Sequence, residues 1–176
     1  MISLPKEIFK AYDIRGIVGK TLTPQIVEAI GHAIGSEALA RKQNTIAVGR
    51  DGRLSGPELS AAMARGIQKS GVNVIDIGMV ATPMLYFATF HLQTHSGVMI
   101  TGSHNPPDYN GIKIVLGGET LSGESIQKLK TRLEKSDLAQ GTGRYQKSNI
   151  TVAYLNRIAG DIKLARPMKI VVDCGN

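Results

Sequence analysis

Short apolar runs rich in β-branched residues alternate along the chain with segments whose apolar positions recur every three or four residues. This alternation predicts an α/β fold. The apolar runs are nearly continuous, as in strands that helices cover on both faces. We therefore expect a layered helix–sheet–helix domain with a mixed, mostly parallel sheet. The expected strands are Thr45–Val48, Val72–Ile77, Gly97–Ile100 and Ile112–Leu116.

The helical segments open on recognisable start signals. Threonine before proline is typical of a cap followed by the first helical residue, and serine three residues before glutamate has the spacing of a capping box. The expected starts are Thr23-Pro24, Ser55-Gly56-Pro57-Glu58 and Thr82-Pro83, and a fourth helix is expected from about Ser122 to Lys135.

The last quarter of the chain suggests a change of domain. Residues Gln140–Ser148 are polar and glycine-rich, which is typical of a linker. A helical pattern and then an apolar run, Met168–Val172, follow close to the last residue. We expect a first domain at residues 1–148 and the incomplete start of a second, similar domain at 149–176. The apolar run, if left uncovered, would favour self-association.

Composition and charge exclude several classes of protein. Hydrophobic residues at 42% and charged residues at 20% are ordinary for a globular domain. The formal charge of +7 is scattered, without a run of five or more Lys/Arg or an aromatic–basic ladder, so no nucleic-acid partner is expected. No apolar stretch is long enough for a signal peptide or a bilayer span. With a single cysteine, Cys174, the expected location is the cytoplasm.

The loop between the third and fourth expected strands carries the most chemistry. Gly102 precedes Ser103, and glycine lets the backbone take strained angles and approach a ligand closely. Two prolines stiffen the exit of the loop. A serine held at such a tip could accept or donate a phosphoryl group, with His104, Asn105 and Lys113 near its oxygens. The residues alone fit equally well an ordinary polar turn of the Asn-Pro type.

Three segments together resemble a known family. The chain is similar to the α-D-phosphohexomutases, most closely to the bacterial phosphomannomutase/phosphoglucomutase branch, from about residue 8 to the last residue. The segments that carry the resemblance are Tyr12-Asp13-Ile14-Arg15-Gly16, Gly49-Arg50-Asp51-Gly52-Arg53-Leu54-Ser55 and Thr101-Gly102-Ser103-His104-Asn105-Pro106.

The resemblance implies a function and a set of site residues. It implies that Ser103 carries a phosphoryl group, that Arg15 and Lys113 lie beside it, and that Tyr12 and His104 line the same cleft. The family interconverts hexose 1- and 6-phosphates, here of mannose or glucose, through a phosphoserine and a bisphosphate intermediate.

The resemblance also implies a metal. In the family, Mg²⁺ binds an oxygen of the phosphoserine, here Ser103, together with three aspartates of an Asp-Gly-Asp-Gly-Asp loop. That loop does not occur in this sequence. The metal site is therefore expected to be incomplete, and the 176-residue chain alone is expected to lack turnover.

Other interpretations remain. Phosphoglucosamine mutases usually have Ser-Ala-Ser where this chain has Thr101-Gly102-Ser103. A non-catalytic domain that binds sugar phosphates, or a purely structural one, is also open. A hydrolase that uses Ser103 with His104 as base is disfavoured, because adjacent residues of an extended loop point apart and no GxSxG motif occurs. From the residues alone Arg15 would form an exposed salt bridge. Arg50, Asp51 and Arg53 would either hold their loop or contact substrate, and they are not counted as catalytic.

Overall fold

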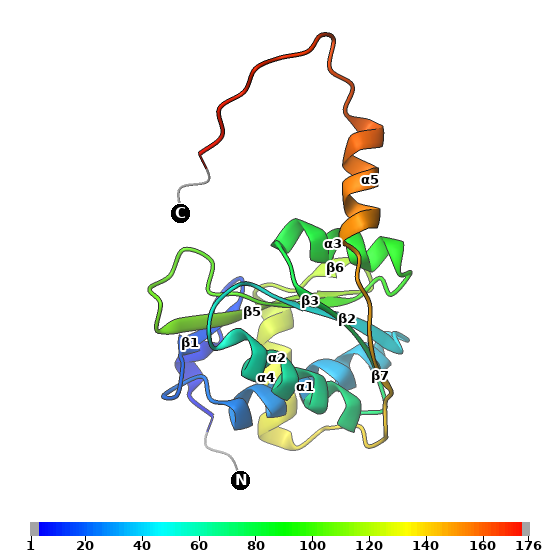
Figure 1. The fold of residues 1–176 in the computed structure, drawn as a ribbon. Coiled ribbons are helices and arrows are strands. Elements are labelled where there is room, and N and C mark those ends of the chain that lie inside the picture. Colours follow the sequence, from blue (N-terminus) through cyan, green and yellow to red (C-terminus); the bar gives the residue numbers. More distant parts are fainter. Residues whose placement is uncertain (1–3, 174–176) are drawn as a thin grey trace.

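The structure is a computed structural model that describes residues 4–173 (Figure 1). Within them a sheet of seven strands is ordered β1-β5-β4-β2-β3-β7, with β6 paired to β5. Strands β4, β2, β3 and β7 run parallel, whereas β5 is antiparallel to β1, β4 and β6. The strands are β1 (Ile14–Ile17), β2 (Thr45–Arg50), β3 (Asn73–Met79), β4 (Gly97–Ile100), β5 (Tyr109–Leu116), β6 (Glu119–Thr120) and β7 (Tyr145–Lys147).

Helices cover both faces of this sheet, as Figure 1 shows. One face packs against α1, α2 and α4 over a large aliphatic core, and the other packs against α3 over a smaller one. The expected helix–sheet–helix layers and mixed, mostly parallel sheet are confirmed. The helices are α1 (Pro24–Ala40), α2 (Gly56–Lys69), α3 (Thr82–His91), α4 (Glu124–Lys135) and α5 (Thr151–Asp161), and a short 3-10 turn, η1, spans Lys6–Ile8.

The two best-packed helices show how sequence sets local structure. Thr23 caps α1 as expected, because its Oγ1 accepts a hydrogen bond from the backbone N–H of Ile26 at 3.3 Å. The α1–α2 crossing depends on Gly66, where any Cβ would overlap the backbone carbonyl of Glu28. The helices therefore pack backbone to backbone, which fixes α2 against the sheet.

The other capping expectations are wrong in detail. Ser55 stands at the N-cap of α2 but caps no backbone N–H; its hydroxyl instead accepts a hydrogen bond from Nδ2 of Asn110 at 2.9 Å. Helix α3 is capped by Ala81, so Thr82 is already helical. In both places tertiary contacts or the following proline, rather than the cap, fix the helix start.

The region from residue 140 onward also differs from expectation. The supposed linker contains β7, an edge strand parallel to β3, and the apolar run Met168–Val172 forms no strand and is exposed. Helix α5 buries none of its residues, and Tyr154 on α5 packs its ring edge against Phe87 of α3, with centroids 5.3 Å apart. Cys174 lies outside the described residues. Self-association of this segment stays a prediction.

Candidate active site

Two loops meet at the end of the sheet where the parallel strands have their C-termini. The Arg53 loop (residues 51–55) follows β2, and the Ser103 loop (residues 101–108) joins β4 to β5. The backbone N–H of Asp51 donates to the carbonyl of Ile100 at 2.9 Å. The carboxylate of Asp51 accepts from the N–H of Gly102 at 3.1 Å and from that of Arg53 at 3.0 Å. Asp51 therefore ties the two loops together at their bases.

The guanidinium of Arg53 holds the Ser103 loop in shape. It donates to four backbone carbonyls, at distances from 2.6 to 3.1 Å, and its Nε lies 3.6 Å from the carboxylate of Asp51. Arginine suits this task because its rigid planar fork presents five N–H donors. The four carbonyls belong to Ser103, Asn105, Pro106 and Tyr109.

Arg53 therefore has the structural role that sequence reasoning left open, although carbonyls rather than the ion pair dominate its contacts. Its signal in the sequence was its place between the end of a strand and a helix start, beside a glycine-rich motif. This local pattern does not predict which loop Arg53 contacts.

Gly102 has a different role from the one expected. Its φ is not in the left-handed region; that conformation is taken by Ser103, with φ of 50°. Glycine is needed at 102 because the guanidinium of Arg53 occupies the place of a side chain, and a Cβ there would lie 2.7 Å from Nη2 and closer still to Nε. Positive φ at a non-glycine residue is uncommon and strained. The serine is thus turned outward at the loop tip, where it is exposed.

Ser103 and His104 are in contact. Oγ of Ser103 lies 3.3 Å from Nδ1 of His104, and both residues are exposed. The expectation that these neighbours point apart is therefore wrong, because the left-handed turn at Ser103 brings the two side chains to one side. Within residues 4–173 no acid hydrogen-bonds to the histidine ring, so no third group orients it as a Ser–His nucleophile pair requires.

Arg15 approaches the loop from β1. Its Nη1 donates to Oδ1 of Asn105 at 3.1 Å, and its Nη2 forms an ion pair with Asp13 at 2.8 Å. Nδ2 of Asn105 in turn donates to the carbonyl of Gly102 at 2.8 Å. Arg15 therefore makes the expected salt bridge and also contacts the Ser103 loop. Its Nε and Oδ1 of Asp13 are buried without a hydrogen-bond partner in the described chain.

Lys113 shares a sheet face with Arg15. Arg15 is paired with Gly111 across the β1–β5 ladder, and Lys113 lies two residues further along β5. Because side chains two residues apart on a strand point to the same face, the two long cations project side by side. The side chain of Lys113 makes no hydrogen bond or ion pair to Ser103 or to any other part of residues 4–173.

Tyr12 is the predicted site residue that the structure connects least to the loop. Its side chain is 79% exposed and has no hydrogen-bond partner in the described residues. The cavity beside the Ser103 loop has a volume of ≈ 740 Å³ and is lined by Ser103, but not by Tyr12, His104, Arg15 or Lys113. Asp51, Arg53, Asn105 and Asp108 line it instead. Of the predicted residues, Ser103 and His104 belong to the loop and Arg15 bonds to it, whereas Tyr12 and Lys113 make no hydrogen bond or ion pair to it in the described chain.

A metal ion would need ligands that this loop does not supply. Among residues 4–173 no group of three or more His, Cys, Asp or Glu side chains is arranged to hold a metal. Two of the three acids near the loop are also engaged, since Asp13 pairs with Arg15 and both oxygens of Asp51 accept backbone N–H bonds, which leaves Asp108 as a single carboxylate. The residues present therefore do not fit a self-contained Mg²⁺ site.

The comparisons agree with an α/β/α domain that carries an exposed serine at a left-handed loop tip, with Arg15 bonded to the same loop. Residues 6–140 match the model of the phosphoglucomutase/phosphomannomutase α/β/α domain I. The chain belongs to this family.

Individual relatives are close. The chain is 58% identical over 174 residues to the phosphomannomutase/phosphoglucomutase of Pseudomonas aeruginosa, covering 99% of this chain and 38% of that protein. It is 55% identical to the phosphoglucomutase of Neisseria meningitidis serogroup B, covering 100% of this chain and 39% of that protein. A crystal structure of a phosphoglucomutase/phosphomannomutase family protein from Burkholderia thailandensis superimposes with a TM-score of 0.89 at 47% identity, over 96% of this chain and 38% of that one. The chain thus spans little more than a third of these relatives.

Proposed function

We propose that this chain is the phosphoserine-bearing part of a phosphohexose mutase that interconverts the 1- and 6-phosphates of a hexose. The proposal depends on one observation above all. The Ser103 hydroxyl is exposed at a left-handed loop tip, and Arg53 holds that loop through four carbonyls. Membership of the phosphoglucomutase/phosphomannomutase family supports it.

The proposed chemistry uses the phosphorylated form of Ser103. Its O–P bond breaks as a free sugar hydroxyl forms a new O–P bond, the sugar hydroxyl loses its proton, and the serine oxygen gains one. The resulting bisphosphate changes its orientation in the site and returns its other phosphoryl group to the serine. Phosphoryl transfer is accelerated mainly by positioning and by stabilisation of charge on the phosphate oxygens.

The proposed roles of the neighbours come from the family resemblance, and the positions of Arg15 and His104 support theirs. Arg15 and Lys113 would stabilise the phosphate oxygens from one face of the sheet, and Arg15 would also hold the loop through Asn105. His104 lies within 3.3 Å of the serine oxygen and could donate to the phosphate or move the serine proton. Tyr12, exposed near β1, would contact the sugar.

The proposal also names a cofactor, substrates and a domain boundary. Mg²⁺, which would neutralise charge on the phosphate oxygens, is proposed as cofactor with ligands other than the phosphoserine supplied from elsewhere. Mannose and glucose phosphates are the proposed substrates. Residues 149–176 are proposed to belong to a following domain, with the first domain at 1–148. No helix in the described chain is long and apolar enough to cross a membrane, and a cytoplasmic location stays a prediction.

The Ser103–His104 contact also favours a second candidate, a serine hydrolase. Such a nucleophile needs a histidine held by a third group and a set of oxyanion donors. Within residues 4–173 His104 has no such partner, and a hydrolase would not need Arg15 on the loop that carries its serine. The mutase therefore explains more of the site.

The test is a chimaera. This chain would replace the aligned 174 residues of the Pseudomonas aeruginosa relative, whose remaining length supplies the rest of the protein. We expect the chimaera to interconvert glucose 1- and 6-phosphates, and Ser103→Ala to lower the rate by at least about 10³-fold. Ser136→Ala is the matched control, because Ser136 is also exposed with a positive φ of 53°. A folded but inactive chimaera, or one indifferent to Ser103→Ala, would contradict the proposal.

A further inference from the structure

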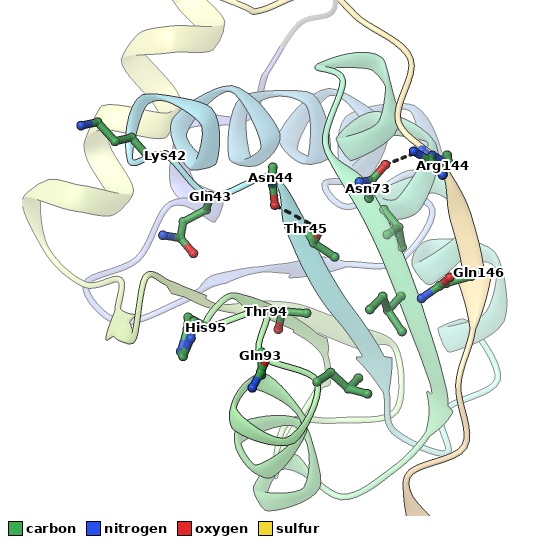
Figure 2. A pocket seen from close by; sticks show the side chains of 13 residues that line it. Lys42, Gln43, Asn44, Thr45, Asn73, Gln93, Thr94, His95, Arg144 and Gln146 are labelled. Carbon is green, nitrogen blue, oxygen red and sulfur yellow. Dashed lines mark hydrogen bonds between the residues drawn. The ribbon is translucent and has the colours of Figure 1, made fainter.

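A second cavity lies at the opposite end of the sheet from the Ser103 loop, where the parallel strands have their N-termini (Figure 2). It is bounded by the starts of β2 and β3, by β7 and by the segment that follows α3. Its volume is ≈ 550 Å³, within the roughly 300–1,000 Å³ of small-molecule sites. The proposed mutase chemistry does not use it.

The lining of this cavity is polar and lacks negative charge. Within the described chain it contains Lys42, His95 and Arg144 and no aspartate or glutamate. Amide and hydroxyl side chains make up most of the remainder, over a small apolar floor of Val74, Ile75 and Leu92. The further polar lining residues are Gln43, Asn44, Thr45, Asn73, Gln93, Thr94 and Gln146.

Several of these side chains have no partner in the described chain. The guanidinium of Arg144 makes no hydrogen bond or ion pair there. Its backbone is bonded instead, through its N–H to Oδ1 of Asn73 at 2.9 Å and through its carbonyl, which accepts from the N–H of Val74 at 2.8 Å. The side-chain amides of Gln93 and Gln146 are likewise without hydrogen-bond partners within residues 4–173. By contrast, Arg41 and Arg132 on the scaffold both bond carboxylates. The cavity therefore holds donors that are available to a ligand.

The backbone at the rim is strained. Only five non-glycine residues in the described chain have positive φ, and three of them, Lys42, Gln93 and His95, line this cavity, with φ of 60°, 54° and 49°. Lys42 and Gln93 each stand one residue beyond a helix cap, where glycine takes this conformation at least cost. The chain instead places a long polar side chain at each position. Ser103, at the candidate active site, shares this feature.

We propose that this cavity binds a phosphorylated small molecule at a site separate from the Ser103 loop. The phosphate lies on Arg144, whose planar fork suits two phosphate oxygens. The hydroxyl-bearing body of the ligand lies against the side-chain amides of Gln93 and Gln146. Figure 2 shows Arg144 and Gln146 on the strand side of the cavity, away from the ends of α1 and α3.

Amide NMR on the full chain tests this directly. The probes are inorganic phosphate, glucose 6-phosphate and uncharged glucose. We expect both phosphates, but not glucose, to shift the backbone amides of Asn44, Thr45 and Thr94 in a saturable way. Shifts at Gly102 and Ser103 report binding at the active-site loop separately, so failure of one site leaves the other readable.

Variants assign the contacts. Arg144→Gln keeps the backbone hydrogen bond to Asn73. It should lower the affinity of the cavity for glucose 6-phosphate by about tenfold. The matched control is Arg166→Gln, since Arg166 is an exposed arginine that does not line the cavity. Gln93→Gly relieves the strained backbone yet should also weaken binding, a combination that a merely structural role would not produce. Absence of saturable shifts, equal shifts with glucose, or an Arg144→Gln variant that binds unchanged would each overturn the proposal.

Discussion

The guanidinium of Arg53 lies against the Cα of Gly102, in the space that any other residue at 102 would need for its Cβ. The same guanidinium donates to the carbonyl of Ser103 at 3.1 Å. One glycine and one arginine, about fifty positions apart in the chain, thus set the direction in which the serine hydroxyl points. This relationship leads to two mutational predictions.

Gly102→Ala should displace Arg53 and loosen the Ser103 loop. Overpacking of this kind typically costs about 1–3 kcal/mol. We expect a lower unfolding free energy by chemical denaturation. In the chimaera we also expect a lower kcat. Gly52→Ala is the matched control, because a Cβ at 52 meets only the sulfur of Met79 at 3.7 Å. Equal effects of the two substitutions would contradict the role assigned to Arg53.

Arg53→Lys should disorder the loop while preserving charge. A single ammonium cannot reach the four carbonyls that the guanidinium bonds, and each lost charge-assisted hydrogen bond is worth roughly 1.5–3 kcal/mol at most. Hydrogen exchange at the amides of Asn105 and Tyr109 should accelerate. Arg65→Lys serves for comparison, since Arg65 binds Glu28 on an exposed helix surface. If loop exchange stays at the wild-type rate, Arg53 does not hold the loop.

Glu37 on α1 forms ion pairs with Arg41, the C-cap of the same helix, at 2.9 Å and with Arg132 of α4 at 3.0 Å, and the second pair joins the two helices. Burial alone would raise its pKa, but the two arginines outweigh burial and lower the pKa below its usual 4.5. The folded state therefore favours the carboxylate, so this stability is present above pH 4.5 and is lost as pH falls through the lowered pKa. Glu37→Gln should destabilise by about 1–3 kcal/mol at pH 7.

The difference between wild type and Glu37→Gln should shrink in acid. Thermal unfolding at pH 7 and pH 3 measures it. A difference that is the same at both pH values would show that the ion pairs do not stabilise the α1–α4 contact.

Tyr145 fastens the edge strand β7 to β3, because its hydroxyl donates to Asp76 at 2.5 Å. Burial and the Asp76 carboxylate raise its pKa to about 12. The folded state thus favours the neutral phenol, so the stabilisation is full below pH 10 and is lost as pH rises through about 12. Tyr145→Phe should lower Tm at pH 8. Above pH 12 the difference in Tm between the variant and the wild type should be smaller. Tyr154→Phe, which removes no hydrogen bond within the described chain, should leave Tm unchanged at either pH.

The pattern of apolar residues predicted the centre of the fold well. Gly97–Ile100 is a strand with the expected bounds, and the other three expected strands lie within or beside observed ones. These strands are buried on both faces, so their own side chains determine them. Strands β1 and β7 were missed because β1 has only four residues, including Arg15 and Gly16, and β7 is exposed and polar. Strand β1 forms by pairing with β5, and β7 forms by pairing with β3. A local sequence pattern does not predict such long-range pairing.

The candidate site shows the same division. The Ser103 loop was recognised from its motif, but the contact of Ser103 with His104 was not, because it follows from a left-handed φ at a residue that rarely adopts one. The role of Arg53 required knowing that residues 53 and 102 meet across two strands. Motifs thus located the chemistry, and long-range contacts decided its geometry.

The central claim is that Ser103 carries the transferred phosphoryl group, and peptide mass spectrometry measures this most directly. The chimaera would be treated with hexose 1,6-bisphosphate, digested and mapped. The account predicts one phosphoryl group on the peptide that contains Ser103, lost with Ser103→Ala and retained with Ser136→Ala. An active chimaera whose Ser103 peptide stays unmodified, or whose phosphoryl group maps to another residue, would contradict it.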